Sequence, residues 1–241
     1  MALKTDLISL WSMNETSGTR ADSHGSITLA DPTSVGSTAG KYSQNAAVFV
    51  SSSSNRLTAA DSASLSFGNE SFAISCWIRL QSLASQNFVT KWNNSSNLRE
   101  FRFHMVGSKF QWEVTSNPAS AGGTVDSASF PSTGVWYWVY MYHDAASDVL
   151  GISVDNGTPS TTSYSLGCND STSEFWVGGR ASGSTYADAH IQQVAIWRGL
   201  KSTDDRTAIY NSGNGLAYAS WDAGGFKAAW AAQRRSRIIG V

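Results

Sequence analysis

The chain has 241 residues and a formal net charge of −1, with 15% charged residues and 21 glycines. This length suits one large all-β domain or two smaller ones, and it buries enough surface for a core without disulfide bonds. The balanced charge does not imply a strongly basic face, so we expect no nucleic-acid partner, and the lack of a long apolar run argues against membrane insertion.

The N-terminal residues and the two cysteines indicate where the chain is made. Polar residues interrupt residues 1–15, and no small-residue cleavage site follows, so this segment does not resemble a secretory signal. Cys76 alternates in phase with apolar neighbours, which is typical of a small buried side chain, and we favour free thiols over a disulfide with Cys168. We therefore expect synthesis in the cytoplasm without export by an N-terminal signal.

Short strand-like segments, separated by turn-forming residues, recur along the chain. In order they are 6–13, 45–50, 56–60, 72–80, 88–92, the hairpin at 100–115, 123–130, 135–143, 150–154, 175–178 and 190–197. Many short strands at this spacing, with little helix, predict an all-β sandwich or jelly roll.

The hairpin at 100–115 has the clearest pattern, because two alternating runs meet at Gly107-Ser108. A two-residue loop that begins with glycine predicts a type II′ turn, and this turn places Arg102 directly opposite Glu113. The other face of the hairpin is wholly apolar and consists of Phe101, Phe103, Met105, Phe110, Trp112 and Val114. Burying six such side chains requires a second sheet packed over the hairpin.

The segment 135–143 is apolar on both faces, one of which holds Trp136, Trp138, Tyr140 and Tyr142. A strand covered on both sides is either a central strand beneath a loop or part of a ligand platform. Because most of the ten tryptophans must be buried, we favour a core role for Trp77, Trp136 and Trp197, and we leave Trp92 open between core and ligand contact.

Helical signals are confined to the C-terminal part of the chain. Ser202 and Asp205 form a start that resembles a capping box, and 211–213 supplies a stop signal. Beyond a glycine pair at 224–225, apolar residues recur at helical spacing. We expect this tail to fold back on its own domain or to dock on a partner, through Phe226, Trp230, Arg234, Arg235 and Arg237.

Several phrases of the sequence resemble a known family. In chain order they are DLISLWSMNETSGTRADSHG, NAAVF, NRLTAADSASLSFGNESFAISCWIRL, FVTKWN, GVWYWVYMYHD, FWVGG, IQQVAIWRG and IYNSGNGL. Together, over about 6–216, they resemble the laminin-G-like branch of the concanavalin A-like lectin/glucanase superfamily. The resemblance implies a jelly-roll sandwich of two curved antiparallel sheets, with ligands on the concave face or at loops on one rim. We therefore divide the chain into a jelly-roll domain at 1–216 and a C-terminal tail at 217–241.

The resemblance also raises the question of calcium. Many relatives carry an Asp-Glu pair where this chain has Gln192-Gln193, and the family's calcium sites use carboxylates near that pair and near the N-terminal aspartate. Asp22 and Asp188 remain as weak candidates, but a hard cation prefers more anionic oxygen than these two supply. We expect no cofactor, with calcium left open.

Catalytic patterns are absent from the sequence. The glucanases that this chain resembles use an E-x-D-x-x-E strand, and none of the five glutamates begins that pattern. Glu113 lies opposite Arg102, which would keep it ionised and suits an ion pair better than a general acid. The four histidines show no metal-ligand spacing, so we expect no enzymatic activity.

Binding of a glycan is better supported, because sugars are held by aromatic faces together with planar polar groups. The candidate ligand contacts are Trp92, Asn93, Asn94, Arg102, His104, Glu113, Trp138, Tyr140, Tyr142 and Trp176. Gln111 shares the polar hairpin face with Arg102 and His104 and is a further polar contact. We expect a non-catalytic module displayed on a phage virion, made in the host cytoplasm, that contacts other virion subunits as an oligomer and binds glycans. The alternatives are a free extracellular lectin or adhesion module and, behind both, a glycoside hydrolase.

Overall fold

The computed structural model describes residues 3–183 and 185–221 and contains fourteen strands and one α-helix within them. The larger sheet is built from β1 (Leu7–Trp11), β2 (Gly36–Ala39), β3 (Asn45–Phe49), β5 (Phe72–Leu80), β10 (Trp136–Asp144), β11 (Val149–Val154), β12 (Ser160–Ser163) and β14 (Ala189–Arg198). The smaller sheet is built from β4 (Leu57–Ala59), β6 (Gln86–Asn93), β7 (Leu98–Val106), β8 (Lys109–Val114), β9 (Gly123–Asp126) and β13 (Phe175–Val177). The helix is α1 (Thr203–Tyr210), and short 3-10 turns lie at Ser51–Ser53, Ala63–Leu65, Asn211–Gly213 and Tyr218–Ser220.

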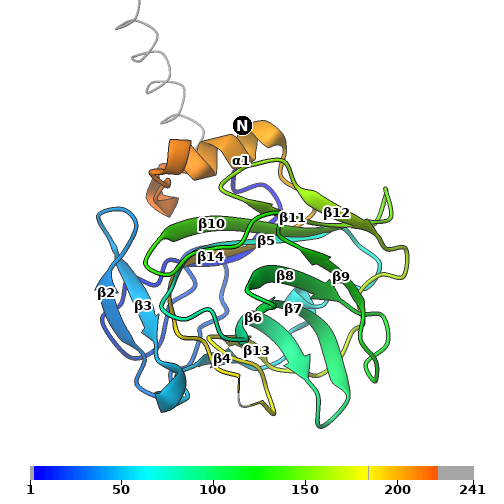
Figure 1. The fold of residues 1–241 in the computed structure, drawn as a ribbon, viewed down its shortest axis with the longest axis horizontal. Helices are drawn as coiled ribbons and strands as arrows, with labels where there is room; N and C mark the ends of the chain where they lie inside the picture. The colour runs from blue at the N-terminus through cyan, green and yellow to red at the C-terminus, as the bar shows by residue number, and fades with distance from the viewer. Residues whose placement is uncertain (1–2, 184, 222–241) are drawn as a thin grey trace, which may run out of the picture.

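The two sheets pack face to face as a jelly-roll sandwich, which confirms the predicted fold class (Figure 1). The larger sheet has the order β12-β11-β10-β5-β14-β3-β2, with β1 paired to β14, and the smaller has the order β4-β13-β6-β7-β8-β9. Some neighbouring strands are consecutive in the sequence, as β6 to β9 are, while others, such as β5 and β14, are far apart. The fold therefore brings residues from distant segments onto one sheet face.

The hairpin of β7 and β8 has the predicted register, with Arg102 opposite Glu113 and Phe103 opposite Trp112. The predicted turn type is wrong. Gly107 and Ser108 both have positive φ, 56° and 60°, which is the type I′ arrangement. Types I′ and II′ both match the twist of the flanking strands, so a leading glycine does not distinguish them.

The apolar face of this hairpin is buried between the sheets, as the pattern predicts. Phe103 and Trp112 are both 0% exposed. Phe72 of the larger sheet meets the ring of Trp112 edge-on, with the ring centroids 5.9 Å apart. Cys76 is buried in the same core, and both it and Cys168 are free thiols, as expected.

A second apolar cluster covers the outer face of the larger sheet. It contains Trp77, Trp138, Tyr140 and Trp197 from the sheet, with Ile209 of α1 and Trp221 packed on them. Figure 1 shows α1 lying on the side of the larger sheet that faces away from the smaller sheet. The segment that is apolar on both faces is therefore a central strand covered by a helical layer, and the expected core roles of Trp77 and Trp197 are confirmed. Trp136 is partly buried at the edge of this cluster.

Two strands were not predicted. β2 and β12 consist of glycine, alanine, serine and threonine, so they carry no apolar alternation, and both lie at edges of the larger sheet. Their backbone hydrogen bonds to β3 and β11 define them as strands.

The helix begins and ends as predicted. The hydroxyl of Ser202 accepts a hydrogen bond from the Asp205 backbone N–H, and Asn211 ends the helix in the left-handed conformation. No helix within the described ranges is long and apolar enough to span a membrane. Of the proposed tail, Tyr218 and Trp221 pack on the larger sheet, so the domain boundary after residue 216 stays a prediction. The predicted docking residues Phe226, Trp230, Arg234, Arg235 and Arg237 lie outside the described residues.

Candidate functional site

The outer face of the smaller sheet is polar, in contrast to the outer face of the larger sheet. One residue from each strand forms a continuous row across it, in the order Thr58, Trp176, Thr90, Arg102, Glu113 and Thr124. The next row contains Asn87, His104, Gln111 and Asp126. Residues two apart on a strand share a face, and an irregularity between Asn87 and Val89 brings Asn87 opposite His104, so all ten residues lie on the same surface.

Arg102 and Glu113 form the predicted ion pair at the centre of this face. The Arg102 Nε and Nη2 atoms lie 2.7 and 2.6 Å from Glu113 Oε2. Glu113 Oε1 accepts a hydrogen bond from the Gly122 backbone N–H at 3.1 Å. Both oxygens of this buried carboxylate are therefore occupied by protein donors, which supports a structural role over that of a general acid.

Trp92 does not offer a free ring face to a sugar. Its side chain is 1% exposed, and the guanidinium carbons of Arg102 and Arg99 lie 4.5 and 5.8 Å from its ring centroid. Its indole N–H donates to Asn94 Oδ1, while Asn93 Oδ1 accepts from the Ser96 backbone N–H. The expected Trp–Asn–Asn contact is thus used within the protein, and Trp92 instead supports two arginines through cation–π contacts.

Trp176 is arranged in the same way. It is 8% exposed, the Arg56 guanidinium lies 5.1 Å from its ring centroid, and its indole N–H donates to Glu174. On this face, guanidinium groups therefore lie over the aromatic rings that were expected to stack on sugars.

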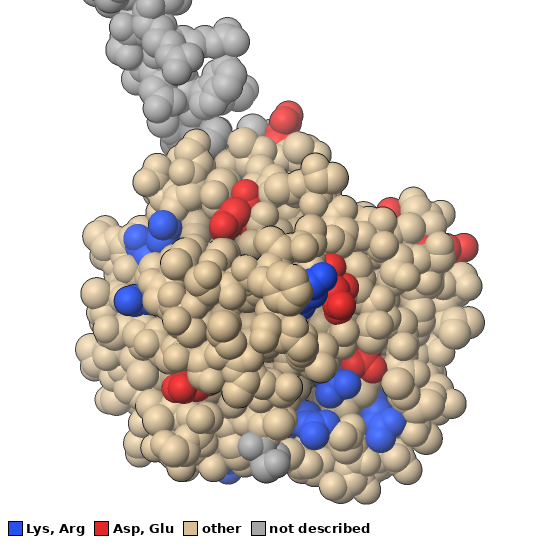
Figure 2. All heavy atoms as spheres, in the orientation of Figure 1, with Lys and Arg blue, Asp and Glu red and all other residues tan. Residues whose placement is uncertain are grey.

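A third arginine, Arg180, was missed by the sequence analysis. It follows Gly178-Gly179 at the end of β13, and a bridge between Asn93 and Ala181 brings this loop beside the end of β6. Its pKa is lowered by burial and by the positive charges of Arg102 and Arg99. Basic side chains gather over the ends of β6 and β7 in Figure 2. The signal that could have found Arg180 is its place next to the glycine pair, but its partners are set by strand pairing.

His104 is neutral in this environment. Burial and the neighbouring Arg102 lower its pKa to about 3. Its Nε2 atom lies 3.7 Å from Glu113 Oε2, and its side chain is 8% exposed. His104 therefore contributes a neutral imidazole, not a charge, to the polar face.

The other predicted contacts lie on the opposite side of the molecule. Trp138 and Tyr140 are 1% and 2% exposed beneath the helical layer of the larger sheet. Tyr142 is half-buried there and lines a small cavity of about 160 Å³ with Tyr140 and Arg206. These three aromatic residues therefore share no surface with Arg102 and Glu113, because β10 belongs to the larger sheet and the hairpin to the smaller one.

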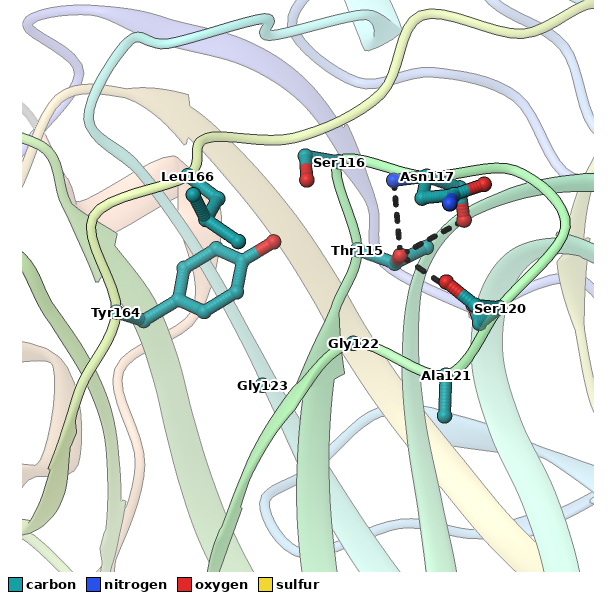
Figure 3. Close-up of a pocket in the computed structure, with 9 residues that line it drawn as sticks. All are labelled: Thr115, Ser116, Asn117, Ser120, Ala121, Gly122, Gly123, Tyr164 and Leu166. Atoms are coloured by element: carbon teal, nitrogen blue, oxygen red, sulfur yellow. Dashed lines mark hydrogen bonds between the residues drawn. The ribbon is translucent and has the colours of Figure 1, made fainter.

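A larger cavity of about 480 Å³ opens at the rim beside β8 and β9. Figure 3 shows the 116–122 loop on one side of it and Tyr164 with Leu166 on the other. The Thr115 hydroxyl accepts a hydrogen bond from the Asn117 backbone N–H and donates to the Asn117 and Ser120 carbonyl oxygens. These hydrogen bonds hold the loop in place. A side chain at Gly123 would collide with the Tyr164 ring, so the close approach of the two segments requires glycine. The lining is uncharged and suits neutral hydroxyl-bearing ligands.

Of the two calcium candidates, Asp22 is engaged by backbone N–H groups. The Asp22 carboxylate accepts hydrogen bonds from the backbone N–H groups of Leu10, Gly25 and Ile27, at 2.8–3.1 Å. Among the residues that the structure describes, no group of three His, Cys, Asp or Glu side chains could hold a metal ion. Calcium is therefore not assigned to Asp22 or Asp188.

Comparison with protein families identifies the fold. Residues 51–205 match the model of the Concanavalin A-like lectin/glucanases superfamily, which is more than half of the chain. The chain belongs to this superfamily. The match supports the laminin-G-like resemblance of this concanavalin A-like domain. No curated protein sequence matches it.

Solved structures share the fold at low sequence identity. The concanavalin A-like domain is similar to the binding domain of Paraclostridial Mosquitocidal Protein 1, with a TM-score of 0.72 and 13% identity over 87% of this chain and 53% of that one. It is similar to the binding domain of botulinum neurotoxin serotype G, with a TM-score of 0.67 and 13% identity over 85% and 50%. For botulinum neurotoxin type C, described as dependent on two ganglioside molecules for cell entry, the TM-score is 0.64 with 14% identity over 87% and 52%.

The chain spans about half the length of these structures. Identities this low establish a common fold and no common ligand. The function of this chain therefore has to be argued from its own surface.

Proposed function

We propose that this chain is a non-catalytic, lectin-like module that binds glycans on the outer face of its smaller sheet. The observation that carries the proposal is the polar row centred on Arg102, beside which Arg99 and Arg180 also lie. Planar guanidinium and amide groups in a fixed array suit the hydroxyl and ring oxygens of a sugar, because each guanidinium offers several N–H donors in one plane. The ganglioside interaction described for botulinum neurotoxin type C supports a glycan as the ligand.

The first experiment is a glycan array probed with the purified chain, followed by calorimetric titration of the best ligand. The variant Arg102→Gln should weaken binding by about tenfold or more, since it removes a charged donor from the centre of the row. Arg79→Gln is the matched control, because Arg79 lies on β5 of the larger sheet and donates to the Gly134 carbonyl. Equal affinity of the two variants would move the site away from this face.

The rim cavity provides the competing location. If Arg102→Gln binds normally while Asn117→Ala with Ser120→Ala does not, the glycan binds between the 116–122 loop and Tyr164. If Arg102→Gln and the Asn117→Ala/Ser120→Ala double variant both bind every array glycan with wild-type affinity, the proposal of a glycan site on the described surface fails.

The non-catalytic part of the proposal is tested separately. The bound glycan should be recovered intact after prolonged incubation, because the Glu113 carboxylate is held by Arg102 and Gly122. Release of shorter products that disappears in Glu113→Gln would instead support the glycoside hydrolase alternative.

We place the module on a virion, as an oligomeric component with other virion subunits as partners, ahead of a free extracellular lectin. The support is the lectin-type fold, which is compatible with display on a particle. Mass spectrometry of purified particles should detect the chain, and its sedimentation should indicate an oligomer. A protein found only as a soluble monomer outside particles would favour the free lectin.

A further inference from the structure

Positive charge is in excess on one part of the outer face of the smaller sheet. Arg99 and Arg102 lie over Trp92, and Arg180 lies beside the end of β6; among the described residues, only Arg102 of these three is paired with a carboxylate, that of Glu113. These three arginines are the arginine cluster. Its cations come from β7 and from the loop after β13, so their proximity is built by the fold and not by the local sequence.

The cluster contains hydrogen-bond donors without protein acceptors. Within the described part of the chain, no protein group accepts from Arg180 Nε, Arg180 Nη1 or Arg99 Nε, although these atoms are buried. Buried polar groups are normally satisfied, and a charged donor left unpaired is costly. These atoms are too buried for a ligand to reach, but both side chains are partly exposed, so a ligand that brings acceptor oxygens can compensate their charge at the surface of the cluster.

The nearby acidic and titratable groups offset the charge of the cluster only in part, although the Glu113 carboxylate also acts on Arg180. Glu113 is occupied by Arg102 and by the Gly122 backbone, and Asp126 accepts a hydrogen bond from Gln111 at 2.6 Å. His104 carries no charge near neutral pH. Two of the three guanidinium groups, those of Arg99 and Arg180, therefore remain available to an external anion.

The position of the cluster is held by an aromatic support. Arg99 and Arg102 both lie over the Trp92 ring, whose indole N–H is fixed by Asn94. Gly183 packs against the Arg180 side chain, where a Cβ would come within 2.7 Å of Nε. Pre-positioned donors lose little conformational entropy on binding, so the cluster is suited to selecting a ligand by charge.

We propose that the glycan bound on this face is acidic, and that its carboxylate or sulfate group binds at Arg99 and Arg180. This inference rests on the proposed glycan-binding function and names the ligand class for the same surface. Carboxylate and sulfate each present at least two anionic oxygens on one atom, and such a pair can accept two parallel hydrogen bonds from a guanidinium group. Neutral sugars offer no group that would compensate the two positive charges.

The test compares matched ligands by calorimetric titration. The probes are lactose, 3′-sialyllactose, which adds a carboxylate, and 3′-sulfolactose, which adds a sulfate. At least one acidic probe should bind about tenfold or more tightly than lactose at low ionic strength, and that advantage should shrink in high salt. The acidic probe that binds identifies which anion the cluster takes.

Substitutions test whether the preference for the acidic probe depends on the arginine cluster. Arg180→Gln should reduce the preference for the acidic probe over lactose to about threefold or less, and Arg180→Lys should retain part of this preference. Arg79→Gln on the larger sheet is the control for a general loss of positive charge, and thermal unfolding verifies that each variant is folded.

The outcomes separate the two proposals. Binding of lactose and the acidic probes with equal affinity overturns the acidic-ligand inference and leaves glycan binding intact. An acidic preference that Arg79→Gln lowers as much as Arg180→Gln overturns the assignment to the cluster. Failure of every saccharide, on the array and in titration, overturns the proposed function itself.

Discussion

A buried ionic cluster lies at the inner side of the smaller sheet, apart from the candidate site. The Lys91 ammonium is 0% exposed and contacts Glu100, Asp61 at 2.7 Å and the Ser171 carbonyl at 2.9 Å. One ammonium therefore faces two carboxylates, so one negative charge is in excess. Burial of Glu100, which outweighs the attraction of Lys91, raises its pKa to about 7.

The Glu100 carboxyl should make folding pH-dependent. Its pKa is raised above the unfolded value, so its stabilising contribution is present below pH 4.5 and is lost as the pH rises through about 7. The free energy of unfolding of the wild type, relative to Glu100→Gln, should therefore fall between pH 5 and pH 8. Urea denaturation of both proteins across this range measures the difference.

Taking the difference between the two proteins removes the effect of other groups. The lowered pKa values of His104, His143 and His190 act in the opposite direction, because the unfolded chain binds protons that the folded histidines exclude. A pH-independent difference between wild type and Glu100→Gln would contradict the raised pKa of Glu100.

At the scale of residues, the sequence could predict contacts within one hairpin but not contacts between distant segments. Arg102 and Glu113 are opposed across one hairpin, so alternation and a two-residue turn were enough to pair them. Arg180 lies beside Arg102 only because β13 pairs with β6, and Ser171 reaches Glu100 through a loop. Neither contact leaves a local periodicity, and the covering of Trp92 by arginines likewise depends on the strand neighbours.

At the scale of elements, the turn between β7 and β8 requires a specific backbone conformation at Ser108. Ser108 adopts φ of 60°, a left-handed conformation that L-residues other than glycine, asparagine and aspartate rarely adopt. A β-branched residue tolerates it least, because its side chain crowds the backbone.

The variant Ser108→Val should lower the free energy of unfolding by about 1–2 kcal/mol. Thr124→Val is the matched control, since Thr124 is exposed on β9 in ordinary strand conformation and should change stability by less than about 0.5 kcal/mol. Urea denaturation at one pH compares both with the wild type. Equal stability of the two variants would contradict the left-handed conformation of Ser108.

Strands that bury an apolar face could be predicted from the alternation of apolar residues in the sequence. The strand β5 has its predicted bounds, because Phe72, Ile74, Cys76 and Ile78 alternate towards the core between the sheets. β2 and β12 were not predicted, because an edge strand of small polar residues is defined by backbone pairing and buries little.

At the scale of the whole molecule, the two outer faces of the sandwich differ in kind. The larger sheet is covered by α1 and by the segment that ends at Trp221, so its tryptophans form a second core. The smaller sheet keeps a polar outer row with arginines over its aromatic rings. The second arrangement gathers three arginines on one outer surface, which is why the proposals concern that face.

This asymmetry leads to a prediction about Trp221. Its ring stacks on Trp197 at a centroid distance of 5.7 Å and an interplanar angle of 10°, and its indole N–H donates to the Leu216 carbonyl at 2.9 Å. Trp221→Ala should lower the free energy of unfolding by about 3–5 kcal/mol, as expected for removing a buried tryptophan. Tyr218→Ala, at a partly buried position of the same segment, should cost clearly less.

The same variant tests whether the two faces act independently. Trp221 and the arginine cluster lie on opposite outer faces of the sandwich, and sites far apart with no shared partners usually contribute additively. Folded Trp221→Ala, measured below its unfolding transition, should therefore bind the best glycan with wild-type affinity. A parallel loss of glycan affinity and stability would mean that the helical layer on the larger sheet shapes the opposite face, and the separation of core and site argued from the topology would be wrong.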